Sequence, residues 1–391
     1  RRPPKRDDKH RFAYAAQLRI DRGMNGQHTL NPGNTDRGIA TQQRAAPAAA
    51  RQPIEDDKVM LRAARDLTKD IAEANPAIYW TDMLVSALIG YGALAGAILA
   101  DSVPFAIALG VISALALYRA LLFIHEISHF RRGAMARFGA AWNVLVGIPL
   151  LTPSFMYEGA HVIHHKRTQY GTVEDPEYLP LALMKPWTLP LFVVIAPLAT
   201  VGLLFRFAVL VPLGAVIPAV RRVTWARFSA LAINPKFRRR PVEDDLRQKV
   251  FWQELGGAVW AWTLIASVFL LGWKPILIAF AVFSVVATVN QLRTLVAHLW
   301  ENEGEPMTVT AQFLDSVNVP PPGRIAELWA PVGLRYHALH HLMPSMPYHS
   351  LPEAHRRLAR ELGEGSTYHG ANHPGMASLV ARITRSTMTR R

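Results

Sequence analysis

The segment PFAIALGVISALALYRALLFI (104–124) runs without interruption into the pentad HEISH (125–129). About twenty largely apolar residues can cross a bilayer as a helix, so the sequence predicts that the pentad lies at one end of a membrane span. The pentad matches the H-E-x-x-H pattern with which zinc proteases hold their metal. A pattern this short also arises by chance, so its meaning depends on the rest of the chain.

The composition indicates a membrane protein. Half of the 391 residues are hydrophobic and 18% are charged, which is more apolar than is usual for a soluble enzyme of this length. The net charge of +14 comes from polar segments that flank apolar runs, as in cytoplasmic loops, so no nucleic-acid partner is expected. The chain has no cysteine and hence no disulfide, thiolate zinc site or iron–sulfur module. Any electrons that it uses must come from another protein.

Four apolar segments are long enough to span a membrane, and they pair as two hairpins. They are residues 81–100, 104–124, 255–272 and 275–297. The connectors inside the hairpins, at Asp101-Ser102 and Trp273-Lys274, carry almost no positive charge, whereas arginine-rich segments lie outside the hairpins. By the positive-inside rule, both hairpins have their two ends in the cytoplasm. The predicted fold class is an all-α integral membrane protein with four transmembrane helices and a cytoplasmic, histidine-rich cap.

Two further apolar stretches do not read as simple spans. Residues 187–220 are interrupted by Arg206 and by four prolines, and basic segments lie on both sides. We therefore expect a re-entrant or shallow hairpin, with a third full hairpin as the alternative. Residues 141–155 are too short to span and are expected to lie in the membrane interface.

The two ends of the chain are polar. The N-terminal part lacks a sustained apolar period, so we expect a mostly disordered arm with one short surface helix over 61–76, ended by Pro76. Met60 is a candidate first residue. Residues 301–391 are expected on the cytoplasmic side, with an amphipathic helix over 352–362. The predicted organisation is an arm (1–75), a membrane domain (76–362) and a basic tail (363–391).

Nine of the fifteen histidines fall in four places, all of which the topology puts on the cytoplasmic side. Two lie in the pentad, three in HVIHH (161–165), three in HALHH (337–341), and one follows the fourth span. Helical residues at i, i+3 and i+4 share a face, so each group can direct its imidazoles to one point. Histidine near a bilayer is costly unless it is used, so we predict a metal centre. The predicted ligands are His125, His129, His161, His164, His165, His298, His337, His340 and His341.

Nine neutral imidazoles are more than one zinc ion binds, since zinc usually takes four ligands. Two metal ions with about four histidines each and positions left open fit the count, and nitrogen-rich open sites suit iron. The other histidines lack this spacing. Capping or surface roles are expected for His349, His355, His369 and His373, and His10 and His28 lie in the N-terminal arm.

Two other functions remain to be weighed. An intramembrane zinc protease would use Glu126 as its base and would need an aspartate ligand from a later span. The stretches 187–220 and 255–297 contain no aspartate, and a protease would leave seven of the grouped histidines without a role. A metal sensor with a degenerate site is the second alternative, and the presence of all nine histidines argues against it.

The boxes HEISH, HVIHH and HALHH, in this order and with these gaps, resemble those of the membrane fatty acid desaturase superfamily over residues 76–360. The stretch HHKRTQYGTVEDPEYLP (164–180) is similar as well. So is RTLVAHLWENEG (293–304), where His298 matches an additional histidine ligand of acyl-CoA desaturases. Those enzymes have an asparagine four residues before that histidine. This chain has Thr294 there, so a different outer ligand set is open.

The resemblance implies two iron ions on the cytoplasmic face that use O2 and two electrons to attack an unactivated C–H bond. It also implies a membrane lipid or acyl substrate and a separate electron donor of the ferredoxin, rubredoxin or cytochrome b5 type. The expected location is the inner membrane of a bacterium. The order of the boxes favours desaturation of an acyl-lipid or acyl-CoA chain. A hydroxylase or ketolase acting on an alkyl, sphingoid or carotenoid substrate stays open.

Three acidic residues stand beside the predicted ligands or close after them in the sequence. They are Glu126, Glu174 and Asp175. A carboxylate in such a place can accept the second N–H of a metal-bound imidazole, which fixes its tautomer. We expect these residues to support the centre rather than to react themselves.

Overall fold

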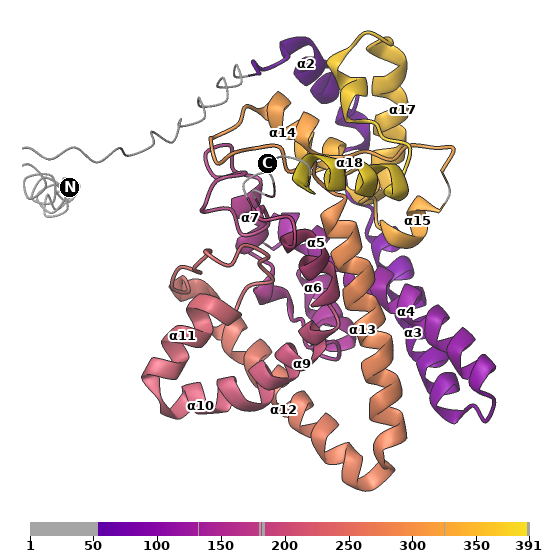
Figure 1. Cartoon of the computed structure of the whole chain (residues 1–391), viewed down its shortest axis with the longest axis vertical. Helices are drawn as coiled ribbons and strands as arrows, with labels where there is room; N and C mark the ends of the chain where they lie inside the picture. The colour runs from indigo at the N-terminus through magenta and orange to yellow at the C-terminus, as the bar shows by residue number, and fades with distance from the viewer. Residues whose placement is uncertain (1–53, 132, 180, 182–183, 324, 389–391) are drawn as a thin grey trace, which may run out of the picture. The chain divides into compact units, whose positions relative to one another are not determined.

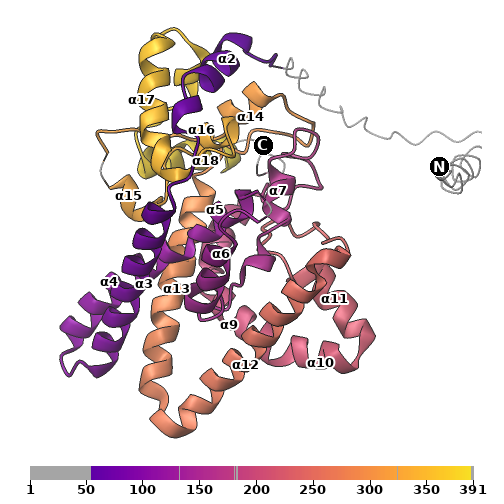
Figure 2. The same cartoon turned by 180° about the vertical axis from the view of Figure 1, so that it is seen from behind.

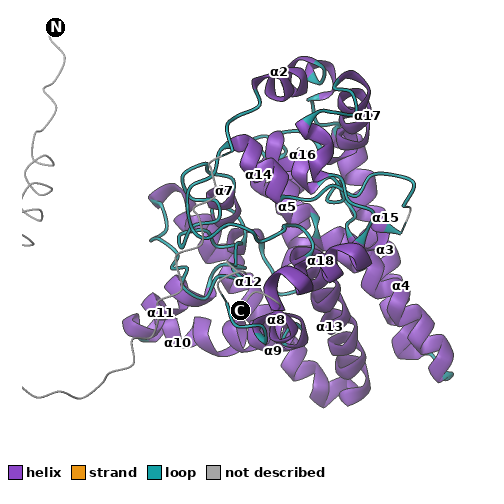
Figure 3. Cartoon of the chain, turned by 45° about the horizontal axis from the view of Figure 1, so that its top comes forward, coloured by secondary structure: helices purple, strands orange, loops and turns teal. Residues whose placement is uncertain are grey.

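The computed structural model describes residues 54–131, 133–179, 181, 184–323 and 325–388. The described residues form helices and loops without a β-strand, as Figure 3 shows by colour. The predicted all-α class is therefore confirmed.

The four predicted spans coincide with the four longest helices. These are α3 (Pro76–Leu99), α4 (Val103–Leu121), α12 (Arg247–Leu271) and α13 (Trp273–Leu295). Five helical stretches of the described residues are long and apolar enough to cross a membrane, and the fifth is Leu198–Val216. Which of the five cross a bilayer, and on which side the histidines lie, stay predictions.

Shorter helices complete the described chain. They are α2 (Lys58–Asp66), α5 (Phe123–His129), α6 (Ala136–Trp142), α7 (Ala160–His164), α8 (Thr188–Val194), α9 (Leu198–Phe205), α10 (Val211–Val216), α11 (Pro218–Phe228), α14 (Val309–Asp315), α15 (Ala326–Trp329), α16 (His337–Leu342), α17 (Leu351–Glu361) and α18 (Met376–Met388). The amphipathic helix predicted over 352–362 is thus α17. The domain boundaries stay predictions.

The first hairpin is held together by close helix packing. Helices α3 and α4 run side by side (Figures 1 and 2), and α13 packs against both. A Cβ atom on Gly90 would lie 2.7 Å from the Leu117 side chain, and one on Gly96 would lie 2.9 Å from the Leu109 side chain. Small residues let membrane helices approach this closely.

Within the segment 187–220 the chain forms α8 and the helical stretch Leu198–Val216, and most of the next helix, α11, lies beyond residue 220. The chain turns at Ile217, and α11 then packs back against α10. Arg206, which interrupts the apolar run in the sequence, is buried, where it donates to the Phe228 carbonyl at 2.6 Å and pairs with Glu254 at 2.7 Å. A buried, paired arginine explains how the run tolerates a charge. The depth of this segment in a membrane stays a prediction.

The stretch 141–155 bends sharply instead of forming one helix. It leaves α6 through a π-helical turn, Asn143–Gly147, which packs against α4. Val144 is exposed whereas Val146 is fully buried, so only one side of the turn faces the core. Its place in the membrane interface stays a prediction.

The helix predicted over 61–76 has different bounds in the structure. Helix α2 ends at Asp66, and Pro76 begins α3 instead of ending a helix. The Asn75 side chain caps α3 by accepting from the Ala77 backbone N–H at 3.0 Å. Proline suits the first helical turn because its missing N–H would have no partner there.

The described part of the N-terminal arm is ordered. Helix α2 packs on α17 and buries Met60 completely, and Arg357 of α17 pairs with Asp70 at 2.7 Å. The expectation of disorder up to residue 75 is therefore wrong for this part, because one face of α2 is apolar enough to join a core. Residues 1–53 lie outside the described residues.

Helix α5 continues directly from α4 and brings the pentad to the end of the long helices. Figure 2 shows α5, α16 and the end of α13 at this same end. Helix α7 packs against α5, and α14 packs against α16. The histidine boxes thus come from segments that the fold brings to one place.

Candidate metal centre

All three histidine boxes are helical, as their spacing predicts. HEISH forms the end of α5, HALHH begins α16, and HVIHH forms α7 with His165 as its C-cap. His298 lies just after α13, in an extended residue that pairs with Ser316. Local helix geometry therefore sets the direction of eight of the nine imidazoles.

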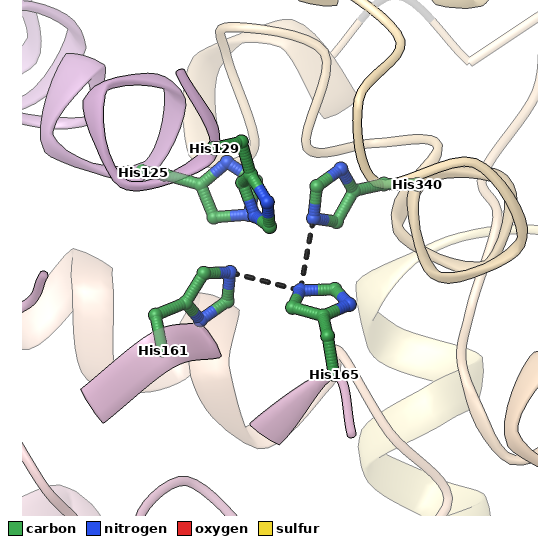
Figure 4. A group of neighbouring side chains, drawn as sticks. All are labelled: His125, His129, His161, His165 and His340. Atoms are coloured by element: carbon green, nitrogen blue, oxygen red, sulfur yellow. Dashed lines mark hydrogen bonds between the residues drawn. The ribbon is translucent and has the colours of Figure 1, made fainter. Parts of the chain in front are cut away.

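The structure brings all nine predicted ligands together in two groups. In each group the nitrogens that could bind a metal lie within 4.8 Å of one another. The first cluster is His125, His129, His161, His165 and His340, and the second cluster is His164, His298, His337 and His341. Figure 4 shows the five imidazoles of the first cluster directed toward one another from α5, α7 and α16.

Each HxxHH box contributes to both clusters. In α7 the i and i+4 residues, His161 and His165, join the first cluster, and His164 joins the second. In α16 the i and i+4 residues, His337 and His341, join the second cluster. The expectation that one box aims at one point is therefore wrong. Residues i and i+4 are close in direction on a helix, whereas i+3 and i+4 differ by about 100°.

The spacing of the nitrogens fits a metal ion in each cluster. The Nε2 atoms of His161 and His165 are 3.0 Å apart, and those of His164 and His298 are 3.2 Å apart. Ligands about 2.1 Å from a metal would be roughly 3.0 Å apart at right angles and about 3.4 Å apart in a tetrahedron. The observed separations lie in this range, so a metal ion fits between the nitrogens of each cluster.

Metal ligands must be neutral imidazoles, and burial favours that form for five of the histidines. Burial, reinforced by the neighbouring imidazoles, lowers the pKa of His161, His165 and His340 well below the ordinary value. Burial likewise lowers the pKa of His337 and His341. The lone pairs of these rings are therefore available at physiological pH.

Asp175 lies where it can accept the Nδ1–H of a histidine of the second cluster, as the sequence predicts. Its two oxygens lie 3.0 and 2.9 Å from Nδ1 of His164, and they also accept the backbone N–H groups of Gly171 and Glu177 at 2.8 Å. Burial alone would lower the pKa of His164, but the charge and hydrogen bond of Asp175 raise it. Asp175 thus fixes the Nδ1–H tautomer and leaves Nε2 for a metal.

Glu177 plays the matching part for the first cluster, and the sequence analysis missed it. Its Oε1 lies 2.7 Å from Nδ1 of His161, and its Oε2 accepts from the Tyr157 hydroxyl at 2.8 Å. Burial raises the pKa of Glu177 to about 7. Pro176 and Glu177 lie in a turn, so no period of the sequence marks Glu177 as inward-facing.

His298 is held by a chain of hydroxyl groups that the sequence analysis also missed. The Tyr170 hydroxyl lies 2.8 Å from Nδ1 of His298 and donates to Asp315 at 2.8 Å, and Tyr178 donates to the same Asp315 oxygen. Since Tyr170 gives its only proton to Asp315, Nδ1–H of His298 donates to Tyr170. The Nε2 lone pairs of His298 and His164 then face each other, which a cation between them would stabilise.

The other two predicted acids differ in position. Glu126 is buried beside His125, but its oxygen is 3.5 Å from Nδ1, longer than a good hydrogen bond. It accepts instead from the Tyr79 hydroxyl at 2.5 Å and the Tyr348 backbone at 3.1 Å. Glu174 is exposed and accepts from Gln169, because the turn that directs Asp175 inward directs Glu174 outward. Glu174 therefore does not take the predicted place.

The remaining histidines stand outside both clusters. His349 accepts from the Asn75 backbone at 3.1 Å, as a capping residue would. His355 is buried and hydrogen-bonds the Tyr368 hydroxyl at 2.8 Å, so the expectation of a surface position is wrong for it. His369 and His373 are partly buried, and His10 and His28 lie outside the described residues.

A cavity of about 290 Å³ adjoins the first cluster. Its wall includes His125, Tyr157 and Glu177, and most of the rest is apolar, with Leu121 of α4 and Leu203 of α9 among the side chains. Apolar walls with few polar groups are typical of a site for a lipid-like ligand. An alkyl chain in this cavity would lie against the histidines.

Apolar helices of membrane length together with two histidine clusters are typical of membrane metalloenzymes whose metal ions are held by histidine. The fatty acid desaturase profile matches residues 100–372, more than half of the chain. A ceramide hydroxylase of Caulobacter vibrioides (strain NA1000 / CB15N) is 46% identical over 335 residues, which cover 84% of this chain and 94% of that protein. The chain therefore belongs to the fatty acid desaturase family.

Membership confirms the predicted family and makes the protein an oxidoreductase of the desaturase and hydroxylase superfamily. Enzymes of this family contain two irons and use a lipid substrate, O2 and an electron donor. The prediction of desaturation in particular is not confirmed, because the relative is a hydroxylase.

Two neighbouring acids allow a matched test of how the centre is supported. Asp175→Asn replaces a carboxylate oxygen with an N–H donor that faces other donors, so we expect iron affinity to fall about 10- to 100-fold. Glu174→Gln changes the next side chain, which contacts no histidine, and should keep the wild-type iron content. Iron per chain, measured after dialysis against a chelator, checks both; equal retention would contradict the role of Asp175.

The hydroxyl chain predicts a selective effect on the second cluster. Tyr170→Phe removes the hydroxyl that contacts both Nδ1 of His298 and Asp315, and leaves the Ser316 hydroxyl, 3.2 Å away, beside that nitrogen. We therefore expect the iron affinity of the second cluster to fall about tenfold or more, and the iron content to fall from about two toward one per chain. Tyr178→Phe removes contacts to Asp315 and to the Asn302 backbone N–H but none to His298, and should lose less. Metal titration of the two variants checks this, and a larger loss in Tyr178→Phe would show that the order of the chain is misassigned.

Proposed function

We propose that the protein hydroxylates the alkyl chain of a ceramide. The observation that carries the proposal is the 46% identity to a ceramide hydroxylase, which extends over 94% of that protein. The convergence of all nine histidines supports it, because a relative that had lost the chemistry would not need to keep them. This is the hydroxylase alternative of the sequence analysis, with a sphingolipid as substrate.

The proposed metal ligands are the nine histidines of the first and second clusters. Two bound iron ions would activate O2 with two electrons, and the net reaction converts a C–H group, O2, two electrons and two protons to C–OH and water. The chain's own residues hold and orient the imidazoles. Asp175, Glu177 and Tyr170 fix the Nδ1–H tautomers of three ligands, one through each contact described above.

The cavity supports an alkyl substrate. Its apolar wall would bind the chain and keep bulk water away from the first cluster, while His125 and Tyr157 form the wall nearest to the reacting carbon. Desaturation and hydroxylation both begin by removing hydrogen from such a carbon. The relative, rather than the residues at the centre, favours return of oxygen to that carbon.

The electron donor is proposed to be a separate protein of the ferredoxin, rubredoxin or cytochrome b5 type, because the chain has no cysteine for an iron–sulfur module of its own. We also propose that the centre faces the cytoplasm of a bacterium, where such donors are found. The arginine-rich segments outside the hairpins support this orientation.

Lipid analysis by mass spectrometry tests the proposal. Cells that contain ceramide and express the wild-type protein should accumulate ceramides with one additional oxygen atom. His164→Ala should abolish this product, since it removes a ligand of the second cluster, whereas His349→Ala removes a histidine outside both clusters and should not. A ceramide that loses two hydrogen atoms would instead establish desaturation, and unchanged ceramides would contradict both outcomes.

A further inference from the structure

Arg293, near the end of α13, is a buried cation without a close partner among the described residues. Its relative exposure is 7%, and its Nε is buried without a hydrogen bond. No described carboxylate lies within ion-pair distance of its guanidinium. A charged group within a membrane helix is costly, so an arginine in this state points to a function.

Two other buried arginines have several hydrogen-bond partners each, although Nη1 of Arg206 has none among the described residues. Arg206 is bonded to Glu254, Ser229 and a backbone carbonyl. Arg335 is bonded to Glu327 and to two backbone carbonyls, at 2.8–3.0 Å. Burial of arginine in this fold therefore comes with several acceptors, and Arg293 is the exception. If Arg293 is to have hydrogen-bond acceptors as the other two do, a bound molecule has to supply them.

Arg293 lines the cavity that adjoins the first cluster, together with His125, Tyr157 and Glu177. It also borders a separate void of only about 10 Å³, about the space of one water molecule. The larger cavity is therefore the place where a ligand can reach the guanidinium. Arg293 and the histidine that would lie nearest to a bound lipid share its wall.

The cavity is polar at one end of its α13 wall and apolar at the other. Along α13, the apolar end of this wall is formed by Phe283, Val286 and Ala287. The polar end, nearer to the histidines, is formed by Asn290, Arg293 and Thr294. From Phe283 to Thr294 the helix rises roughly 16 Å. A lipid with a polar end and an alkyl chain fits this wall in one direction, with its polar end at Arg293.

We propose that Arg293 binds the polar end of the lipid substrate by donating hydrogen bonds to a neutral oxygen acceptor, such as the amide carbonyl of a ceramide. This rests on the hydroxylase function proposed above. The guanidinium has five N–H donors in a rigid fork, so it can hold one oxygen and fix its direction. Arg293 is thus a positioning residue: it determines which carbon of the chain lies beside the first cluster.

The holoenzyme in detergent is compared with Arg293→Gln and with Arg293→Lys, which keeps the charge but not the fork. Four properties are measured: iron per chain, melting temperature with and without a short-chain ceramide, kcat and KM, and the position of the new hydroxyl. Phe283→Ala is the matched control, because it changes the apolar end of the same cavity.

Arg293→Gln should keep its iron and melt at a higher temperature than wild type without lipid, because an unpaired buried cation is removed. Ceramide should raise its melting temperature less than that of wild type. The KM of Arg293→Gln should rise about 10- to 100-fold, and its product should carry the hydroxyl on several different carbons. Arg293→Lys should lie between wild type and Arg293→Gln in both properties. Phe283→Ala should change the preferred chain length but keep the hydroxyl position.

Three results would overturn the proposal. Loss of iron and a lower melting temperature in Arg293→Gln, with unchanged stabilisation by ceramide, would mean that Arg293 holds the metal centre. Stabilisation of wild type by a free fatty acid but not by ceramide would mean that Arg293 binds a carboxylate. If wild type makes no ceramide product, the proposed function fails, and equal ceramide stabilisation of wild type and Arg293→Gln would then overturn the role of Arg293 as well.

Discussion

The mutual approach of nine imidazoles, seven of them buried and two half-buried, is the constraint on which the rest of the structure depends. Where Nδ1–H is committed to an acceptor, as in His161 and His164, the Nε2 lone pair faces another imidazole nitrogen 3.0–3.2 Å away. Such lone pairs repel each other unless a cation lies between them. The box helices α5, α7 and α16 and the segment after α13 therefore have to meet within a few ångströms, and the surrounding acids have to fix the tautomers.

The sequence predicts the parts of this centre that follow local rules. Apolar length predicts the four long helices, and helical spacing predicts that the boxes present their histidines inward. Spacing could not predict how HVIHH divides between two clusters, because that depends on where α5 and α16 lie. Nor could it predict Glu177 or Tyr170: both act through loop geometry, where no period tells which side chain turns inward, and so Glu174 was chosen in error.

The sequence predicts the kind of reaction less well than it predicts the metal site. Hydroxylation and desaturation need the same ligands and the same first step, so the histidine pattern cannot separate them. In our proposal the position of the reacting carbon in the cavity separates them. Arg293 at the polar end of that cavity, and the apolar wall that begins at Phe283, are features of this chain that bear on it.

The central claim is that two metal ions occupy the two histidine clusters. X-ray absorption at the iron edge, combined with elemental analysis of the purified full-length protein, tests this most directly. The account predicts about two irons per chain, each bound by several imidazole nitrogens and by no sulfur. One iron per chain, zinc in place of iron, or irons bound mainly by carboxylates would contradict it.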